Sequence, residues 1–380
     1  MAIDAPQSGP QPAEAGLVVG HWPHLRGKET IARIMWSVAA ALVPAAVAAG
    51  YFFGIRAYLH IGLAVATAVI TEAIITHLRL GKMTVGDGSA VVSGLLVGFC
   101  LPAQARWFVP IVASVVAVAI AKHCFGGLGY NIWNPALVGR AFVHISFPTD
   151  MNPSSWPVLT GDHFLGDVGT AVAGVPEGVQ AVTGASPLAL AKGIANQGYA
   201  DVDVLKVLTD AHGRGLWEMA VGTVGGSIGE TSALLLIIGA IYLIYKGWVR
   251  WQIPVAYLGT VALGALFLPL YLTGGEGGTG PTGWQPIITC MPDAALRFVL
   301  WHLLGGGLVL GAFYMATDMV TTPITSRGML IFGAGCGVLT ILIRLYGGYP
   351  EAVCYSILLM NTTVPLIDRW TQPRIFGHKR

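Results

Sequence analysis

The sequence is poor in charged residues: Asp, Glu, Lys and Arg make up only 11% of its 380 residues, whereas 54% are hydrophobic. A soluble globular domain usually carries about 25% charged residues, so this composition excludes an ordinary soluble domain. The basic residues are spread over many short segments and form no basic patch, so nucleic acid is not an expected partner. The composition predicts a polytopic membrane protein that lies in the lipid bilayer.

Cysteine is also scarce. The five cysteines form no CxxC spacing and no Cys/His pairing: Cys100, Cys124, Cys290, Cys336 and Cys354. We expect them to be small apolar packing residues, and we expect no metal site. The sequence also lacks a catalytic triad and a pattern of paired carboxylates, so no catalytic residue is predicted. The N-terminal stretch up to about Gly20 has no apolar core after a basic start, which predicts a disordered tail rather than a signal peptide.

Long apolar runs, in contrast, fill most of the chain. Ten of them approach the length of about 20 residues that a membrane-spanning helix needs, although some are short. Five come before a polar segment at 148–223, namely 34–53, 59–78, 89–102, 107–121 and 134–147. Five follow it, namely 228–245, 253–272, 298–316, 329–345 and 352–367.

The two groups of five runs suggest a duplication, which short similarities support weakly. Residues 94–98 (GLLVG) resemble residues 307–311 (GLVLG), and a Gly-Gly pair at 126–127 precedes the fifth run as the pair at 347–348 precedes the tenth. Because five is odd, the two repeats would cross the membrane in opposite orientations, as in transporter-like folds. We therefore expect an all-α polytopic fold of about ten transmembrane helices in two inverted five-helix repeats, with some helices short or broken.

The basic residues predict the orientation, because Lys and Arg are enriched in cytoplasmic loops. With the N-terminus inside, the inner segments would hold most of them: Arg26, Lys28, Arg33, Arg79, Lys82, Lys122, Lys246, Arg250, Arg327, Arg369, Arg374, Lys379 and Arg380. The short outer connections would hold four: Arg56, Arg106, Arg297 and Arg344. We expect a cytoplasmic tail (1–32), a first repeat (33–147), an outer loop (148–223), a second repeat (224–368) and a cytoplasmic C-terminal tail (369–380).

Two features of the apolar runs could carry chemistry. The ionisable residues Glu72, Arg140, Glu230 and Asp318 lie in or beside apolar runs, where a charge is costly and by default suggests function, although a structural ion pair is the alternative. The glycine-rich run at 222–232 could expose backbone N–H groups to a phosphate or could serve tight helix packing. It is not a P-loop, because no Gly-Lys-Ser/Thr follows.

Two polar stretches at chain turns add to these features. Residues 131–142 (NIWNPALVGRAF) predict a loop that enters a short helix, with Arg140 placed to pair with an anionic group. Thr183-Gly-Ala-Ser186, followed by Pro187, lies in the only long polar segment, although Gly and Ser are also ordinary turn residues.

Several motifs occur in the order found in the RnfD/NqrB family, which the sequence resembles from about Trp22 to His378. They are residues 131–142 (NIWNPALVGRAF), 226–233 (GSIGETSA), 315–318 (MATD), 349–352 (YPEA) and 372–378 (QPRIFGH). Members are membrane subunits of the Rnf (ferredoxin:NAD) and Nqr (NADH:quinone) ion-pumping oxidoreductases, and the family fold is two inverted five-helix repeats. The short N-terminal tail and the PRIFGH ending look like the RnfD branch of the family.

The resemblance implies a flavin. In the family, a hydroxyl residue of a Ser/Thr-Gly-Ala-Thr motif is esterified to the phosphate of FMN by a separate flavin transferase. The matching acceptor is Ser186, where the family usually has Thr, and Thr183 is the alternative. We expect Arg140 and the start of the sixth run to contact bound flavin, through Gly226, Ser227, Glu230 and Thr231. The family can also hold riboflavin non-covalently, which we expect nearer the inner side.

The resemblance also implies a role. We expect a flavin-carrying subunit of an Rnf-type complex in a bacterial or archaeal inner membrane, which couples electron transfer between ferredoxin and NAD to Na⁺ or H⁺ translocation. The other subunits of that complex would be its partners, and the chain would not turn over alone. The alternatives are a quinone-linked NqrB-type subunit and, from another class, a non-redox channel or transporter of the same fold.

Overall fold

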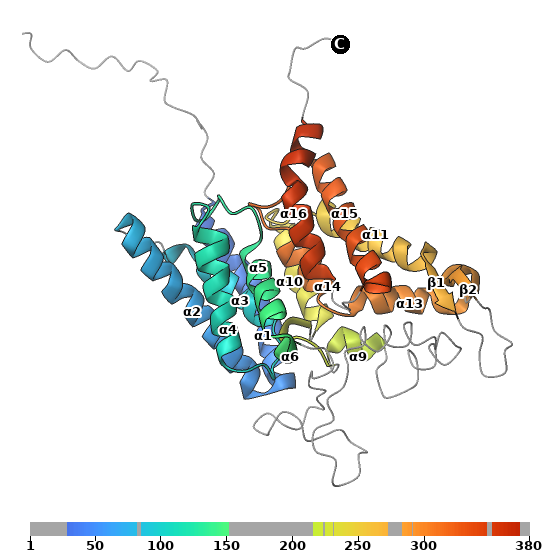
Figure 1. Cartoon of the computed structure of the whole chain (residues 1–380), viewed down its shortest axis with the longest axis horizontal. Coiled ribbons are helices and arrows are strands. Elements are labelled where there is room, and N and C mark those ends of the chain that lie inside the picture. Colours follow the sequence, from blue (N-terminus) through green and yellow to red (C-terminus); the bar gives the residue numbers. More distant parts are fainter. Residues whose placement is uncertain are drawn as a thin grey trace, which may run out of the picture.

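The computed structural model describes residues 29–81, 85–151, 216–222, 225–230, 232–272, 283–290, 292–347 and 352–372. Within these ranges the chain is mostly helical. The helices form two groups, one made of the helices before residue 152 and one of those after residue 232, and the two groups lie side by side (Figure 1). The predicted helical, polytopic character is confirmed.

The first group contains five principal helices, and each coincides with a predicted apolar run. They are α1 (Ile31–Phe53), α2 (Ile55–Leu80), α3 (Ser89–Phe99), α4 (Phe108–Val115), which continues as the π-helical η2 (Val116–His123), and α5 (Pro135–Ser146). A 3₁₀ turn, η1 (Val85–Asp87), precedes α3, and the short α6 (Pro148–Met151) follows α5. The start of α5 follows from local chemistry, because Asn134 Oδ1 accepts from Ala136 N at 3.0 Å and Pro135 suits the first helical turn.

The second group is more irregular. After α9 (Leu216–Val221) and the 3₁₀ turn η4 (Ile228–Glu230), its elements are α10 (Ala233–Tyr245), α11 (Gln252–Phe267), β1 (Pro269–Leu272), β2 (Gly283–Pro286), α12 (Ile287–Cys290), α13 (Pro292–Leu304), α14 (Leu308–Leu310), the π-helical η5 (Gly311–Met315), α15 (Ser326–Tyr346) and α16 (Val353–Trp370). The sixth helix therefore begins at Ala233, where Ser232 Oγ accepts from Leu235 N at 3.4 Å, and not at the predicted Ile228.

The prediction of an all-α fold is wrong at the end of the seventh run. There, β1 pairs with β2 in an antiparallel ribbon, with Pro269 opposite Pro286. The cause is local, because the residue before a proline is pushed out of the helical region. Leu268 has an extended backbone (φ −71°, ψ 133°) immediately before Pro269, so α11 ends and a strand begins.

The predicted eighth span, 298–316, is broken rather than continuous. Helix α13 and the segment formed by α14 and η5 meet at an angle of 64°. Residues 305–307, all glycine, occupy the break, and Gly306 has a φ of 64°, which L side chains rarely adopt. Gly307, the first residue of the stretch that the sequence shares with the third run, is the last residue of this break.

Three described helices are long and apolar enough to span a bilayer: Ile31–Phe53, Ile55–Arg79 and Ser326–Tyr346. The bent pair of helices at 295–304 and 308–315 would raise the number of candidate spans among the described residues to four if the pair is counted as one span. Four shorter apolar helices accompany them: Ser89–Phe99, Phe108–His123, Ala233–Tyr245 and Gln252–Phe267.

The two groups of helices touch along a seam. Helix α1 packs against α10, α5 packs against α16, and α3 packs against η4. Gly239 permits the first of these contacts, since a Cβ there would come within 2.5 Å of the Ala41 carbonyl oxygen. The seam is where polar and charged side chains collect.

Candidate functional site

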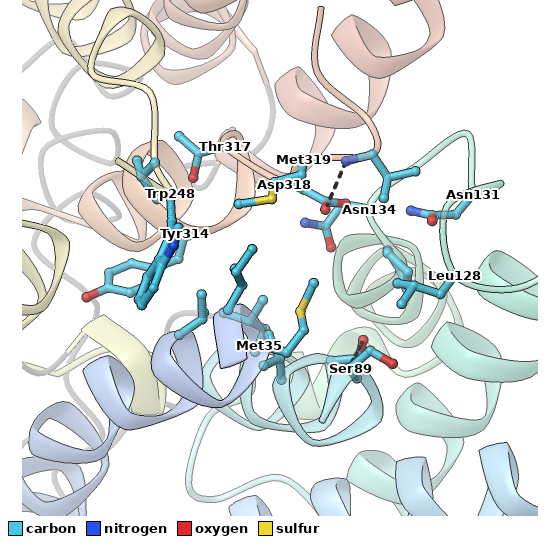
Figure 2. Close-up of a pocket in the computed structure, with 18 of the residues that line it drawn as sticks. Met35, Ser89, Leu128, Asn131, Asn134, Trp248, Tyr314, Thr317, Asp318 and Met319 are labelled. Carbon is cyan, nitrogen blue, oxygen red and sulfur yellow. Dashed lines mark hydrogen bonds between the residues drawn. The ribbon is translucent and has the colours of Figure 1, made fainter. Parts of the chain in front are cut away.

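A cavity lies at this seam, with about 790 Å³ of empty space including its open mouth. Its walls come from both groups of helices: α1, α3 and the start of α5 on one side, and the end of α10 and η5 with the loop after it on the other. Figure 2 shows these side chains converging on one space. Most of the lining is apolar, and the polar lining residues are Ser89, Ser93, Lys122, Asn131, Asn134, Thr317 and Asp318.

Asn134 links the two groups of helices at this cavity. Its Oδ1 caps α5, and its Nδ2 donates to the Met315 carbonyl oxygen at 3.1 Å, on the far side of the seam. Asn134 is 3% exposed, so both interactions are buried. Two facing residues therefore fix the start of α5 against the end of η5.

Asp318 is held more loosely in the cavity wall. Its Oδ1 accepts from Val320 N, and its Oδ2 accepts from Thr321 Oγ1, both at 3.4 Å (Figure 2 draws the first). These distances are long for hydrogen bonds. Asn131 also hydrogen-bonds this carboxylate, so Asp318 has a third neighbour in the cavity wall.

A buried ion pair stands beside the cavity. Lys122 Nζ lies 2.6 Å from Glu72 Oε2, and each side chain is 2% exposed. Ser89 Oγ accepts from Lys122 Nζ at 2.6 Å and donates to Asp87 Oδ1 at 2.8 Å. The prediction that Lys122 lies in an inner loop is therefore wrong: η2 carries it into the interior, where Glu72 balances its charge.

A second set of charged side chains surrounds the break between α13 and α14. Arg140 is 8% exposed and lies one and a half turns into α5, as predicted. A Cβ on Gly307 would lie 3.5 Å from Glu230 Oε1 and 4.0 Å from Arg140 Nη1. The structure therefore brings Arg140 and Glu230, two of the predicted site residues, to the same glycine.

Arg344 completes this set, and its predicted place in an outer connection is wrong. It is 4% exposed, and its guanidinium donates from Nη1 to the His302 carbonyl at 2.5 Å and from Nη2 to the Gly305 carbonyl at 3.0 Å. Carbonyl groups at the end of a helix lack partners within the helix. The end of α13 therefore supplies a reason for Arg344 to turn inward.

The other predicted flavin contacts fall in two places. Gly226 and Ser227 are buried just before η4, and a Cβ on Gly226 would lie 2.8 Å from Glu230 Oε2. Thr231, Thr183 and Ser186 lie outside the described residues. Contact of any of these residues with flavin stays a prediction.

The sequence reasoning also missed a pair that joins α5 to α16. His144 Nδ1 and Tyr355 Oη are 2.6 Å apart. His144 follows Arg140 by four residues, so the two lie on the same face of α5. That spacing was the available signal, whereas the partner on α16 is 211 residues away in sequence.

The chain has apolar helices that are long enough to span a bilayer, and charged side chains are buried between them beside the cavity. These features define an integral membrane protein with ionisable groups inside the bilayer, where such groups mark functional sites. The chain belongs to the NQR2, RnfD, RnfE family, whose model matches residues 18–377.

Three relatives are similar to the chain over almost their full length, and each of the three is the D subunit of a complex. One belongs to the proton-translocating ferredoxin:NAD(+) oxidoreductase complex of Clostridium ljungdahlii and is 46% identical over 360 residues, which are 94% of this chain and 95% of the relative. Another belongs to the Na(+)-translocating ferredoxin:NAD(+) oxidoreductase complex of Acetobacterium woodii and is 42% identical over 364 residues, 96% of both chains. A third, from the ion-translocating oxidoreductase complex of Cronobacter sakazakii, is 34% identical over 372 residues, 94% of this chain and 98% of the relative.

Proposed function

We propose that this chain is a membrane subunit of an Rnf-type complex, which couples electron transfer between ferredoxin and NAD to the translocation of Na⁺ or H⁺. The similarity to these D subunits over 94–96% of the chain carries the proposal. The names of these relatives differ in the ion, H⁺ in one and Na⁺ in another, so membership in the family leaves the ion open. The other subunits of the complex would be the partners of this chain, which would not turn over alone.

The architecture proposed for this role is two inverted five-helix repeats in an inner membrane, with both termini in the cytoplasm. Equivalent contacts support the repeats: α2 packs against α3 and α4, as α11 packs against α13 and α15, and α4 meets α5 as α15 meets α16. Contacts between counterparts, α1 with α10 and α5 with α16, are those expected at a twofold axis. Reporter fusions test the orientation: a cytoplasmic reporter is expected to be active at the C-terminus and inactive within 148–223.

The proposed redox group is FMN, tied through its phosphate to the Ser186 hydroxyl by a flavin transferase. Ser186 Oγ would lose its proton and bond to the phosphorus of an FMN group that the donor holds in a phosphoanhydride; the P–O bond of that anhydride would break, and the other phosphate of the donor would leave. The covalent bond would prevent loss of the cofactor from the outer side. A bound flavin accepts one or two electrons, and the protein fixes its ring and tunes its potential. Support comes from the motif and from the position of residues 148–223 between the two halves.

Intact mass spectrometry tests the covalent site. Protein produced with the transferase should carry an FMN-sized increment, and Ser186→Ala should lack it while Thr183→Ala retains it. An increment that persists in Ser186→Ala would move the site to Thr183 or elsewhere. Protein without any increment, and without a fluorescent band in a denaturing gel, would favour the non-redox transporter.

The cavity at the seam is the proposed site of a second, non-covalent flavin, riboflavin. Its lining is mostly apolar with a few polar groups, which is the usual character of small-molecule sites. Trp248 and Tyr314 supply aromatic surface, and Asn131, Asn134 and Thr317 supply polar groups that suit a flat ring with amide edges. The cavity lies at the predicted inner side, where we expect riboflavin.

The carboxylates beside this cavity are proposed to link electron flow to ion movement. Asp318 lines the cavity, and Glu72 lies behind it in contact with Lys122. Nearby electron transfer would change the charge that these groups experience, since interactions between charges are strong where water is excluded. Two assays on membranes that contain the complex separate this role from that of the quinone-linked homologue. Reduction of NAD by ferredoxin is expected for an Rnf-type complex, and reduction of quinone by NADH is expected for the homologue.

A further inference from the structure

Three charged side chains from three elements meet at the break between α13 and α14, and we call them the helix-break cluster: Arg140, Glu230 and Arg344. Gly307 lies close to both Arg140 and Glu230. A Cβ added to this glycine would lie 3.5 Å from Glu230 Oε1 and 4.0 Å from Arg140 Nη1. Arg344 approaches from α15 and binds the carbonyl groups of His302 and Gly305. The cluster therefore joins both groups of helices at one interrupted helix.

The helix-break cluster carries an excess positive charge. Two guanidinium groups face one carboxylate, and Arg140 and Arg344 are the cationic groups that act on Glu230. Arginine keeps its proton even when it is buried. Among the described residues, Glu230 Oε1 has no hydrogen-bond partner, and the hydrogen bonds that Glu230 receives come from Ser227. The formal charge of the three described side chains is thus +1.

The cavity at the start of α5 has the opposite charge. Asp318 and Lys122 line it, and Glu72 lies against Lys122. Counting Asp87 with these three groups gives two more negative than positive charges there. Asn134 lines the cavity. Arg140 follows Asn134 by six residues, which is about 9 Å along a helix. The positive charge of Arg140 therefore lies about two helical turns from the negatively charged surroundings of the cavity.

We propose that the helix-break cluster is an electrostatic barrier that excludes Na⁺ and H⁺ from passive movement between the two halves of the protein. The inference rests on the proposed role in ion translocation. A fixed positive charge in a dry passage repels cations, as an arginine does in water-selective pores. Hydrogen bonds to the end of α13 hold Arg344 in place, so this charge cannot move away into water.

Passive leak through the reconstituted complex tests the barrier. Liposomes that hold the whole complex receive a Na⁺ or pH gradient, and radioactive Na⁺ or a pH-sensitive dye reports leak while ferredoxin and NAD are absent. Arg344→Gln lowers the cluster charge from +1 to 0 and should raise the leak of Na⁺ or H⁺ by about tenfold or more, because charges a few Å apart interact strongly in such surroundings. Arg106→Gln, on an exposed surface, should leak like the wild type.

Charge restoration separates a barrier made of charge from one made of packing. Adding Glu230→Gln to Arg344→Gln returns the cluster charge to +1, and leak should fall back to the wild-type value. Arg344→Lys keeps the charge and should also stay tight. A double variant that leaks as much as Arg344→Gln, or an Arg344→Gln complex that stays tight, would overturn the proposal.

A second variant and an activity assay cover the cases in which Arg344→Gln does not assemble or the complex is inactive. If Arg344→Gln does not assemble, Arg140→Gln makes the same change in charge from the first group of helices and is judged by the same leak. Ferredoxin-dependent NAD reduction is measured in the same liposomes. If the wild-type complex shows none, the proposed function fails, whereas the leak results still decide the barrier.

Discussion

Lys122 Nζ donates to Glu72 Oε2 across 2.6 Å in a part of the protein where each side chain is 2% exposed. Since the two residues are 50 positions apart, the pair fixes η2 against α2. Such a pair need not stabilise a fold more than apolar side chains would, but losing one partner leaves a buried charge uncompensated. The pair therefore predicts a strongly asymmetric mutational result.

Lys122→Met should lower the free energy of unfolding by about 3–5 kcal/mol, because the Glu72 carboxylate would remain buried without its cation. Combining it with Glu72→Gln should recover much of the loss. Thermal unfolding of the purified protein in detergent measures both, with Lys246→Met at the exposed end of α10 as the control. A double variant no more stable than Lys122→Met would contradict this account.

Blocking the cavity should remove the second flavin and spare the covalent one. Ser93 lines the cavity, so Ser93→Trp should lower the riboflavin released on denaturation, while flavin bound to the polypeptide remains. Ser37→Trp is the matched control. Both serines donate to a carbonyl four residues earlier, but Ser37 does not line the cavity. Chromatography of the released flavin is the measurement, and equal release from wild type and Ser93→Trp would count against the site.

Two glycines in neighbouring helices should respond oppositely to alanine. A Cβ on Gly94 of α3 would lie 2.6 Å from Val65 Cα, so Gly94→Ala should force α2 and α3 apart and cost about 1–3 kcal/mol. A Cβ on Gly62 of α2 meets nothing within 4 Å. Gly62→Ala should therefore be neutral or stabilise by up to about 1 kcal/mol. Unfolding midpoints of the two variants decide the matter, and a similar loss in both would refute the close approach.

A closed set of three buried hydroxyl groups should stabilise the second group of helices. Tyr257 Oη lies 2.7 Å from Thr340 Oγ1 and 3.0 Å from Ser356 Oγ, and the last two atoms are 2.7 Å apart. Tyr257→Phe removes one member and should cost about 1–3 kcal/mol, because a buried partner loses a hydrogen bond. Tyr245→Phe, at an 85% exposed position, is the control, and the same thermal assay should show little change there.

Much of the fold follows from the sequence, because apolar runs and helix caps are local properties. The bounds of α1 and α5 agree with the predicted runs to within a few residues, and Asn134-Pro135 marks the start of α5. The strand after α11 also had a local cause in Pro269, although the apolar run concealed it. Hydropathy alone does not distinguish an apolar strand from the end of a helix.

The arrangement of the candidate site was harder to predict. Arg140 and Glu230 were recognised as costly charges in apolar surroundings, and the structure brings them to one glycine. Lys122 and Arg344 were assigned to loops because each stands at the end of an apolar run. Their partners are the Glu72 carboxylate and the carbonyls of α13, 50 and about 40 positions away, and no local pattern indicates them.

The π-helical segments η2 and η5 set the rotational register of the residues within and after them. A π turn holds more residues than an α turn, and Lys122 lies within η2, while Asp318 comes soon after η5. Removing one residue from either segment would keep the hydropathy of the chain almost unchanged. It would nevertheless rotate the later side chains by about 100° around the helix axis. Lys122 would then turn away from Glu72, or Asp318 from the cavity, so the length of these two segments carries information that their composition does not.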